Sequence, residues 1–251
     1  MSTGALDWTA GLPEPGPGRG PEPEPEPEPA SAEGLRERKK RLMRKQLSDT
    51  ATAMFLERGF DAVRVAEVAE ACGVSEKTVF NYFPVKEALV MDRLEATLAA
   101  LRTGLADAAV PPVQAALLIL DRELAGLTGW LAGQQDAGQV RQAVRRFGDL
   151  IRSTPALRAY QADMMERSVV VATEVLAARA GMIPDDPEPQ IAARALLGLW
   201  RVQADSLRKH LEQAPTSARL HELVTADVRR AAQLIDTGLR AFATTLPQAG
   251  R

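Results

Sequence analysis

The feature that most constrains the fold is a pair of short helical segments joined by a glycine turn between Val65 and Phe83. The first segment, VAEVAEACG, has helical spacing and ends at Gly73, a residue type that commonly terminates helices. Ser75 then stands where a hydroxyl caps the next helix, EKTVFNYF. A helix, a short glycine turn and a second helix together predict a helix-turn-helix motif.

A longer, basic helix is predicted before this motif. It begins at Leu35, carries apolar residues at helical spacing and has Gly59 in position to end it. Its first half holds seven Lys/Arg residues within residues 36–45, against a single acid. Residues 1–34, by contrast, hold seven acids and one arginine. The net charge of −2 for the whole chain therefore hides a basic segment behind an acidic one.

Composition and spacing divide the chain into four predicted segments. Residues 1–34 contain PEPEPEPEP and are predicted to be a disordered acidic tail, and residues 246–251 a disordered C-terminus. Residues 35–83 are predicted to form the helix-turn-helix domain and residues 84–245 a helical domain with six helices. The breaks at Pro, Gly and Ser place these helices at 84–108, 112–132, 137–152, 155–181, 188–212 and 217–244. Because no strand pattern or repeat occurs, the predicted fold class is all-α: a three-helix N-terminal domain and a six-helix C-terminal bundle.

The span Leu35–Leu94 resembles the DNA-binding head of the TetR family of bacterial repressors. The matching stretches are MFLERGF, VAEVAEACGVSEKTVFNYF and PVKEAL. The basic first helix and FNYFPVKE resemble the actinobacterial branch that includes the mycofactocin-type regulators. The resemblance implies a ligand-responsive transcriptional regulator, a repressor, that binds a pseudo-palindromic double-stranded DNA operator as a homodimer. A small-molecule effector would release it by moving the helix that follows Pro84.

The helix capped by Ser75 is expected to enter the major groove and present its side chains to base edges. The exposed candidates are Glu76, Lys77, Thr78 and Asn81, and Ser75 at the cap is predicted to be a DNA-binding residue as well. Lys77 can donate to guanine, and Glu76 can accept from cytosine N4. Three apolar side chains of the same segment are expected to pack inward: Val79, Phe80 and Phe83.

Five further residues are expected to hold the DNA backbone. Arg44, Lys45 and Arg64 are predicted to make positioning contacts with phosphates. The resemblance implies a phosphate contact for the Tyr82 hydroxyl, with packing against the first helix as the alternative. Lys86 is expected near free N–H groups that also attract phosphate, with a surface ion pair as the alternative. Family members often carry Thr where Arg64 stands, so this chain lacks the oxygen that would cap the second helix.

One head reads only a few base pairs, so a dimer is expected. The last two helices carry apolar stripes, and the resemblance implies that these two helices of each subunit form the dimer interface. The interface candidates are Leu196, Leu199, Leu223, Val228, Ala231, Leu234, Ile235 and Leu239. The alternative is that these stripes face the core of their own subunit.

The middle of the helical domain is predicted to hold an effector pocket, because the resemblance implies one there. The candidate lining residues are Trp130, Phe147, Tyr160, Met164, Trp200 and Gln203. Ordinary core packing is the alternative for each of them singly.

Other functions find little support in the sequence. His210 and His221 lie on different predicted helices without a metal-binding or catalytic spacing, and Cys72 has no evident base partner. We therefore expect no enzyme, no cofactor and no metal site. The lone cysteine excludes an internal disulfide, and no apolar run is long enough for a membrane span, so a cytoplasmic protein is expected. A DNA-binding regulator without a ligand, and an activator, remain as alternatives.

Overall fold

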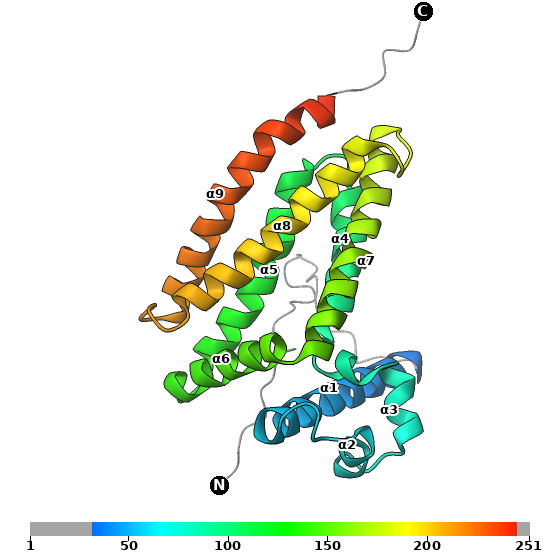
Figure 1. Cartoon of the computed structure of the whole chain (residues 1–251), viewed down its shortest axis with the longest axis vertical. Helices are drawn as coiled ribbons and strands as arrows, with labels where there is room; N and C mark the ends of the chain where they lie inside the picture. The colour runs from blue at the N-terminus through cyan, green and yellow to red at the C-terminus, as the bar shows by residue number, and fades with distance from the viewer. Residues whose placement is uncertain (1–31, 245–251) are drawn as a thin grey trace, which may run out of the picture. The chain divides into compact units, whose positions relative to one another are not determined.

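The computed structural model describes residues 32–244, and within that range the chain contains helices and no strands. Contacts divide it into two compact units, with the division after Asp92 (Figure 1). The first unit, called the head below, contains α1 (Ala32–Arg58), α2 (Val65–Ala71), α3 (Glu76–Tyr82) and the 3₁₀ helix η1 (Lys86–Leu89). The second contains α4 (Arg93–Ala106), α5 (Pro112–Ala132), α6 (Ala137–Ser153), α7 (Pro155–Ala180), α8 (Pro187–His210) and α9 (Ser217–Thr244). The predicted all-α fold class is confirmed.

Two glycines end the helices of the head as their positions predict. Gly59 follows α1 with φ of 88°, and its N–H donates to the carbonyl of Phe55 at 2.9 Å. Gly73 follows α2 with φ of 68°, a left-handed conformation that a residue with a Cβ adopts only with strain. The helices then close over a small core whose members are all buried: Leu47, Ala51, Phe55, Val68, Val79 and Phe83.

The head extends beyond the boundary predicted at residue 83, and the single helix predicted at 84–108 is wrong. Pro84 is followed by η1, and α4 begins only at Arg93. Ala88 and Leu89 are buried, and the Leu89 carbonyl accepts a hydrogen bond of 2.9 Å from the Ser48 hydroxyl of α1. This contact docks the segment on α1, so the chain completes the head before it enters the second unit.

The two predicted disordered termini lie mostly outside the described residues. Residues 1–31 and 245–251 are not described by the structure, so the predictions of an acidic tail and of a disordered C-terminus stay predictions. The basic helix α1 begins at Ala32, slightly before the predicted start at Leu35.

The six helices of the second unit are confirmed, with ends close to the predicted ones except at the start of α4. Proline occupies the first turn of α5, α7 and α8, where its missing N–H leaves no helical hydrogen bond unmade. Gly181 ends α7 in the left-handed conformation with φ of 68°. Packing joins α8 to both α9 and α7, and α5 to α9, around a core of leucines (Figure 1).

A charged cluster joins α8 to α9 around Asp227. The Asp227 carboxylate accepts from the Ser206 hydroxyl at 2.8 Å and lies 3.0 Å from His210 Nε2. It also pairs with Arg230, one turn along α9. The hydrogen bond from Ser206, with those from His210 and Arg230, lowers the pKa of Asp227 from an ordinary 3.8 to about 2. The ionised form of Asp227 is therefore the one that stabilises this helix pair.

Replacing Asp227 with asparagine should remove part of the acid sensitivity of folding. Because the pKa of Asp227 is lower in the folded state, its stabilising contribution is complete above about pH 4 and is lost as the pH falls toward about 2. We expect the free energy of unfolding, measured by urea titration, to fall less steeply over this window in Asp227→Asn than in the native protein. Asp163→Asn, at an exposed carboxylate of α7, is the matched control and should leave the slope unchanged.

Candidate nucleic-acid interface

The N-terminus of α3 is built as the sequence predicts. The Ser75 hydroxyl accepts a hydrogen bond from the Thr78 N–H at 3.1 Å, which satisfies one of the free donors of the first turn. The hydroxyls of Ser75 and Thr78 are also 2.8 Å apart and bonded to each other. The cap fixes where α3 begins and therefore which of its side chains face outward.

One face of α3 is exposed along its whole length. At 100° per residue, Glu76, Phe80, Lys77 and Asn81 occupy a continuous arc of about 140°. All four are exposed, whereas Val79 on the opposite side is buried. This exposed face is able to offer a donor, an acceptor, an amide and an aromatic ring to a ligand.

Phe80 corrects the sequence prediction. Val79 and Phe83 pack inward as expected, but the Phe80 side chain is 44% exposed. Its position explains this, because it lies between Glu76 and Lys77 on the helical wheel. The angular arrangement could have revealed it from the sequence, had the helix start at Glu76 been fixed first. An exposed ring here adds an apolar surface of the kind that meets thymine methyl groups.

Thr78 and Tyr82 lie outside the exposed arc: at 100° per residue Thr78 is about 60° beyond Asn81, and Tyr82 is nearly opposite the middle of the arc. Both are half-buried, and the Thr78 hydroxyl is already bonded to that of Ser75. The backbone carbonyl of Tyr82, at the end of α3, accepts a hydrogen bond of 2.7 Å from Arg44. The DNA contacts predicted for Thr78 and Tyr82 stay predictions. These two side chains are less exposed than those of Lys77 and Asn81.

Arg44 is engaged inside the head instead of pointing to a free surface. Its Nε and Nη2 each lie 2.6 Å from one carboxylate oxygen of Asp92, and its Nη1 donates to the Tyr82 carbonyl. The guanidinium also stacks 4.5 Å from the centre of the Phe83 ring. Arg44 thus ties α1 to the end of α3 and to the last residue of the head. The sequence analysis predicted a phosphate contact for Arg44 and not these contacts inside the head.

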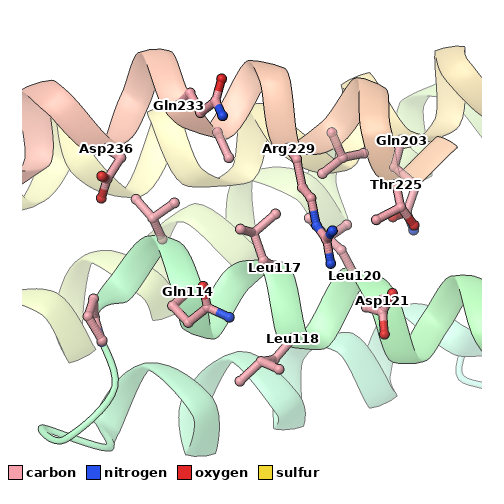
Figure 2. A pocket seen from close by; sticks show the side chains of 14 residues that line it. Gln114, Leu117, Leu118, Leu120, Asp121, Gln203, Thr225, Arg229, Gln233 and Asp236 are labelled. Carbon is pink, nitrogen blue, oxygen red and sulfur yellow. The ribbon is translucent and has the colours of Figure 1, made fainter. Parts of the chain in front are cut away.

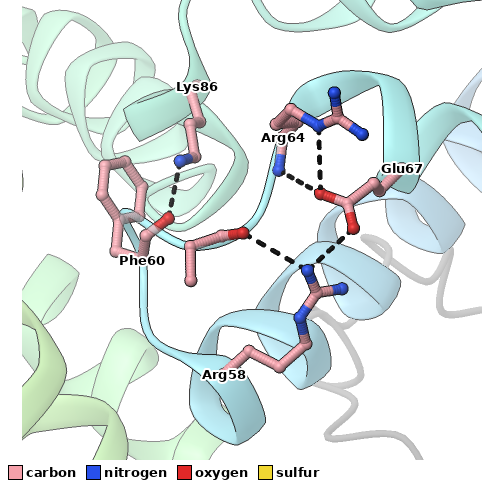
Figure 3. Close-up of polar contacts among 6 residues, drawn as sticks. Arg58, Phe60, Arg64, Glu67 and Lys86 are labelled. Carbon is pink, nitrogen blue, oxygen red and sulfur yellow. Dashed lines mark hydrogen bonds and ion pairs between the residues drawn. The ribbon is translucent and has the colours of Figure 1, made fainter.

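Lys86 is also directed into the head (Figure 3). Its Nζ donates to the Phe60 carbonyl at 2.6 Å and lies 4.2 Å from the centre of the Phe60 ring and 5.5 Å from that of Phe55. Burial of the ammonium lowers the pKa of Lys86. In this conformation the side chain fastens η1 to the turn after α1, and its predicted phosphate contact would require the ammonium to leave that site.

The Glu67 carboxylate caps the start of α2, where Arg64 has no side-chain oxygen to do so (Figure 3). The Arg64 N–H donates to the Glu67 carboxylate at 2.7 Å, and Arg58 donates to the other carboxylate oxygen at 2.7 Å. The hydrogen bond from the Arg64 backbone and then that from Arg58 lower the pKa of Glu67. An acid three residues after the residue that precedes the helix is the pattern that could have indicated Glu67.

Because the backbone of Arg64 makes the cap, its guanidinium is left at the surface. The Arg64 side chain is 82% exposed, and its guanidinium comes no closer than 3.6 Å to the Glu67 carboxylate. The guanidinium is therefore able to reach a phosphate. Lys45 pairs with Asp49 at 2.8 Å along α1, and residues 36–40 of the basic run are exposed. The head therefore offers exposed basic side chains on α1 and at the start of α2.

The six residues predicted to line an effector pocket lie in different surroundings. Trp130 and Met164 are buried, and Tyr160 packs against the core cluster that includes Met164. Phe147 is half-buried, and the Trp200 indole N–H donates to Glu123 at 3.0 Å. Of the six, Gln203 lines the groove described below.

A polar link between helices lies beside Trp200 and was missed in the sequence. The second carboxylate oxygen of Glu123 accepts from the Thr97 hydroxyl at 2.6 Å, so this acid on α5 joins α4 to α8. A single glutamate in an otherwise apolar helix face is the signal that could have pointed to it.

The predicted dimer residues differ in their exposure. Leu196, Leu199 and Val228 are buried within their own unit, so for these three the alternative of core packing holds. Leu234 is 83% exposed, which leaves a large apolar side chain on the outer face of α9. The half-buried members are Leu223, Ala231 and Ile235. The side chain of Leu239 lies outside the described residues.

The sequence of this chain matches a known family of proteins. The family described as "Bacterial regulatory proteins, tetR family" matches residues 47–92, which cover most of the helix-turn-helix head. The chain is also 32% identical over 219 residues to the HTH-type transcriptional regulator TcmR of Streptomyces glaucescens, covering 78% of this chain and 91% of that protein. The chain belongs to the TetR family of bacterial transcriptional regulators.

The second unit is similar to one branch of that family. The MftR C-terminal domain matches residues 133–239. Over 154 residues the chain is 29% identical to the mycofactocin biosynthesis transcriptional regulator MftR of Mycobacterium tuberculosis (strain ATCC 25618 / H37Rv), covering 61% of this chain and 73% of that protein. The resemblance to the mycofactocin-type branch is confirmed.

A solved structure is similar at greater distance. It is described as a TetR-family transcriptional regulator from Mesorhizobium loti MAFF303099, with 19% identity and a TM-score of 0.41 over 78% of this chain and 97% of that one. Family membership makes this chain a DNA-binding regulator, and the expectation that it is not an enzyme is confirmed. Among the helices of residues 32–244, none combines the length and apolar composition that a bilayer crossing requires.

Proposed function

We propose that this regulator is a homodimeric repressor that reads a pseudo-palindromic operator with the exposed face of α3 and is released by a small-molecule effector. The observation that carries the proposal is the capped α3, whose arc of Glu76, Lys77, Phe80 and Asn81 is free of core contacts on its exposed side. A helix of this kind fits the major groove, where each base pair has a distinct pattern of donors and acceptors.

The exposed side chains divide into sequence readers and positioning contacts. Lys77 donates to guanine O6 or N7, Asn81 is suited to adenine, and Phe80 meets thymine methyl groups. Arg64 and the exposed cations of α1 bind phosphates, which adds affinity without sequence information. Arg44 and Lys86 hold the head together and act on DNA only through the position of α3.

Replacing Lys77 and Arg64 separately tests this division. Lys77→Ala should lower the affinity for the preferred site by about 1–3 kcal/mol and relax the preference at one base pair of each half-site. Arg64→Ala should weaken all sequences alike and reduce the slope of log K against log salt by about 0.9 for each phosphate that is no longer neutralised. Fluorescence anisotropy with a library of site variants at several salt concentrations measures both.

Glu70→Gln, at an exposed position on α2, serves as the control and should leave base preference unchanged. If Lys77→Ala and Arg64→Ala lower affinity uniformly and by the same salt-dependent amount, the assignment of Lys77 as a sequence reader is wrong.

Dimerisation follows from the size of the recognition surface. A single α3 spans a few base pairs, so specificity on a genome requires two heads on related half-sites. The exposed Leu234 on α9 supports the outer face of this helix as the contact between subunits. An effector would act by binding more tightly to a dimer whose two α3 helices do not match the spacing of the half-sites. A coupling free energy of about 1–3 kcal/mol between effector binding and DNA binding is enough to release the DNA.

A regulator without an effector is the second candidate. The burial of Trp130 and Met164, and the engagement of Trp200 with Glu123, favour a packed core where a pocket was predicted. A ligand screen by thermal shift, with release from DNA as the second readout, separates the two candidates.

A further inference from the structure

An elongated groove runs between α5 and α9, with Gln203 of α8 contributing to its lining (Figure 2). Its volume is about 490 Å³, within the range of small-molecule sites. On α5 it extends from Val113 to Asp121, a length of about 12 Å at the rise of an α-helix. Its apolar lining comes from Val113, Leu117, Leu118, Leu120, Val228 and Ala232.

The groove contains polar groups that the protein itself leaves unused. The Thr225 hydroxyl is buried and has no hydrogen-bond partner among the described residues, and such a group costs free energy when left unsatisfied. A helical threonine has two accessible χ1 rotamers, so this hydroxyl can turn toward a bound group. Arg229 extends from α9 toward α5 in Figure 2, and within residues 32–244 it has no ion pair or hydrogen bond.

The two acids of the groove lining, Asp121 and Asp236, have partners of their own, and no hydrogen bond or ion pair joins either of them to Arg229 among the described side chains. Asp121 accepts from His221 Nε2 at 3.0 Å, and the other ring nitrogen of His221 lies 3.3 Å from the Thr128 hydroxyl. Asp236 has an interaction of its own and lies further along α9. An anionic group beside Arg229 would therefore be attracted by a guanidinium that has no competing carboxylate bonded to it.

We propose that this groove binds an elongated amphipathic carboxylate. The carboxylate lies against the Arg229 guanidinium, with Thr225 and Gln203 as further donors, and the apolar body lies between Leu117 and Val228. Binding to the groove is a property of the second unit alone and does not depend on the proposed DNA release. If the groove is also the effector site of the proposed function, the effector is an elongated amphipathic carboxylate.

Calorimetric titration of the full chain tests the proposal with three ten-carbon probes below their micelle concentrations: decanoate, decanol and decyltrimethylammonium. Decanoate should bind more tightly than the other two. Arg229→Gln should weaken decanoate at least tenfold, and Thr225→Val about two- to tenfold, as expected for losing a charged and a neutral hydrogen bond. Arg219→Gln, at an exposed arginine of the first turn of α9 that pairs with Glu222, should leave decanoate binding unchanged.

Three outcomes overturn the proposal: no decanoate binding, decanoate binding that Arg229→Gln leaves intact, or equal binding of the cationic probe. Circular dichroism melts of each variant show whether a loss of binding reflects unfolding instead, and Thr225→Val, which removes only an unpaired hydroxyl, keeps a folded test available. A separate DNA titration distinguishes the two proposals. Decanoate that binds without changing DNA affinity supports the groove and contradicts its role as the effector site.

Discussion

Arg44→Ala should lower DNA affinity for every sequence alike while leaving the salt dependence of binding unchanged. The Arg44 side chain is 35% exposed, and its guanidinium is bonded to Asp92 and to the Tyr82 carbonyl at the end of α3. Its loss removes charged hydrogen bonds and leaves the Asp92 carboxylate, only 15% exposed, without its partner. We expect the head to lose about 2–3 kcal/mol of stability.

The salt slope separates this positioning role from the phosphate contact first predicted. Removing a cation that neutralises a phosphate would reduce the slope by about 0.9 per head, whereas displacing α3 with all its cations present would not. Anisotropy titrations at several salt concentrations and urea unfolding of the same variant provide the two readouts. A reduced slope with unchanged stability would contradict the positioning role.

A double-mutant cycle with Asp92 gives the matched control. Asp92→Ala alone should destabilise the head by a similar amount, and the double variant should be little worse than either single one, because the two side chains act as a pair. Arg44→Lys should not restore function, since an ammonium cannot donate to Asp92 and Tyr82 in the same planar geometry. Additive losses would show that Arg44 and Asp92 act independently.

Leu234→Asp should dissociate the dimer and, with it, most operator binding. The side chain is 83% exposed in one subunit, and a two-fold interface would bury it in both subunits at once. Placing a carboxylate there twice should weaken dimerisation by about 4 kcal/mol, roughly a thousandfold. Sedimentation equilibrium measures the dimer constant, and anisotropy on a full operator against a half-site measures the loss of cooperative binding.

Ile183→Asp is the control for this variant, because Ile183 is 62% exposed in the turn between α7 and α8. It should leave both dimerisation and DNA binding unchanged. A native dimer constant in Leu234→Asp would place the contact between subunits on another face of the chain.

The predictions from sequence succeeded where the signal is local. Prolines in the first turns of α5, α7 and α8, and glycines after α1, α2 and α7, fix helix ends through their own backbone geometry. The cap at Ser75 is equally local, since it joins residues three apart. These features could therefore be predicted without knowing which helix packs on which.

Contacts with partners far along the chain could not be predicted from the sequence. Arg44 and Lys86 look like surface cations in sequence, but each finds its acceptor far along the chain, at Asp92 and Phe60. The helix predicted to run on from Pro84 is divided into η1 and α4, and the Leu89 carbonyl between them accepts a hydrogen bond from Ser48 of α1. The groove between α5 and α9 likewise depends on how two distant helices pack, so no local pattern could indicate it.

Selection of bound fragments from the source genome by the purified full-length protein tests the central claim most directly, namely that α3 reads duplex DNA twice per assembly. The account predicts enrichment of inverted repeats whose half-site centres lie about one helical turn apart, or a multiple of it, and loss of that enrichment in Lys77→Ala. A folded protein that enriches no fragment over random competitor DNA, or only single unrepeated sites, would contradict it.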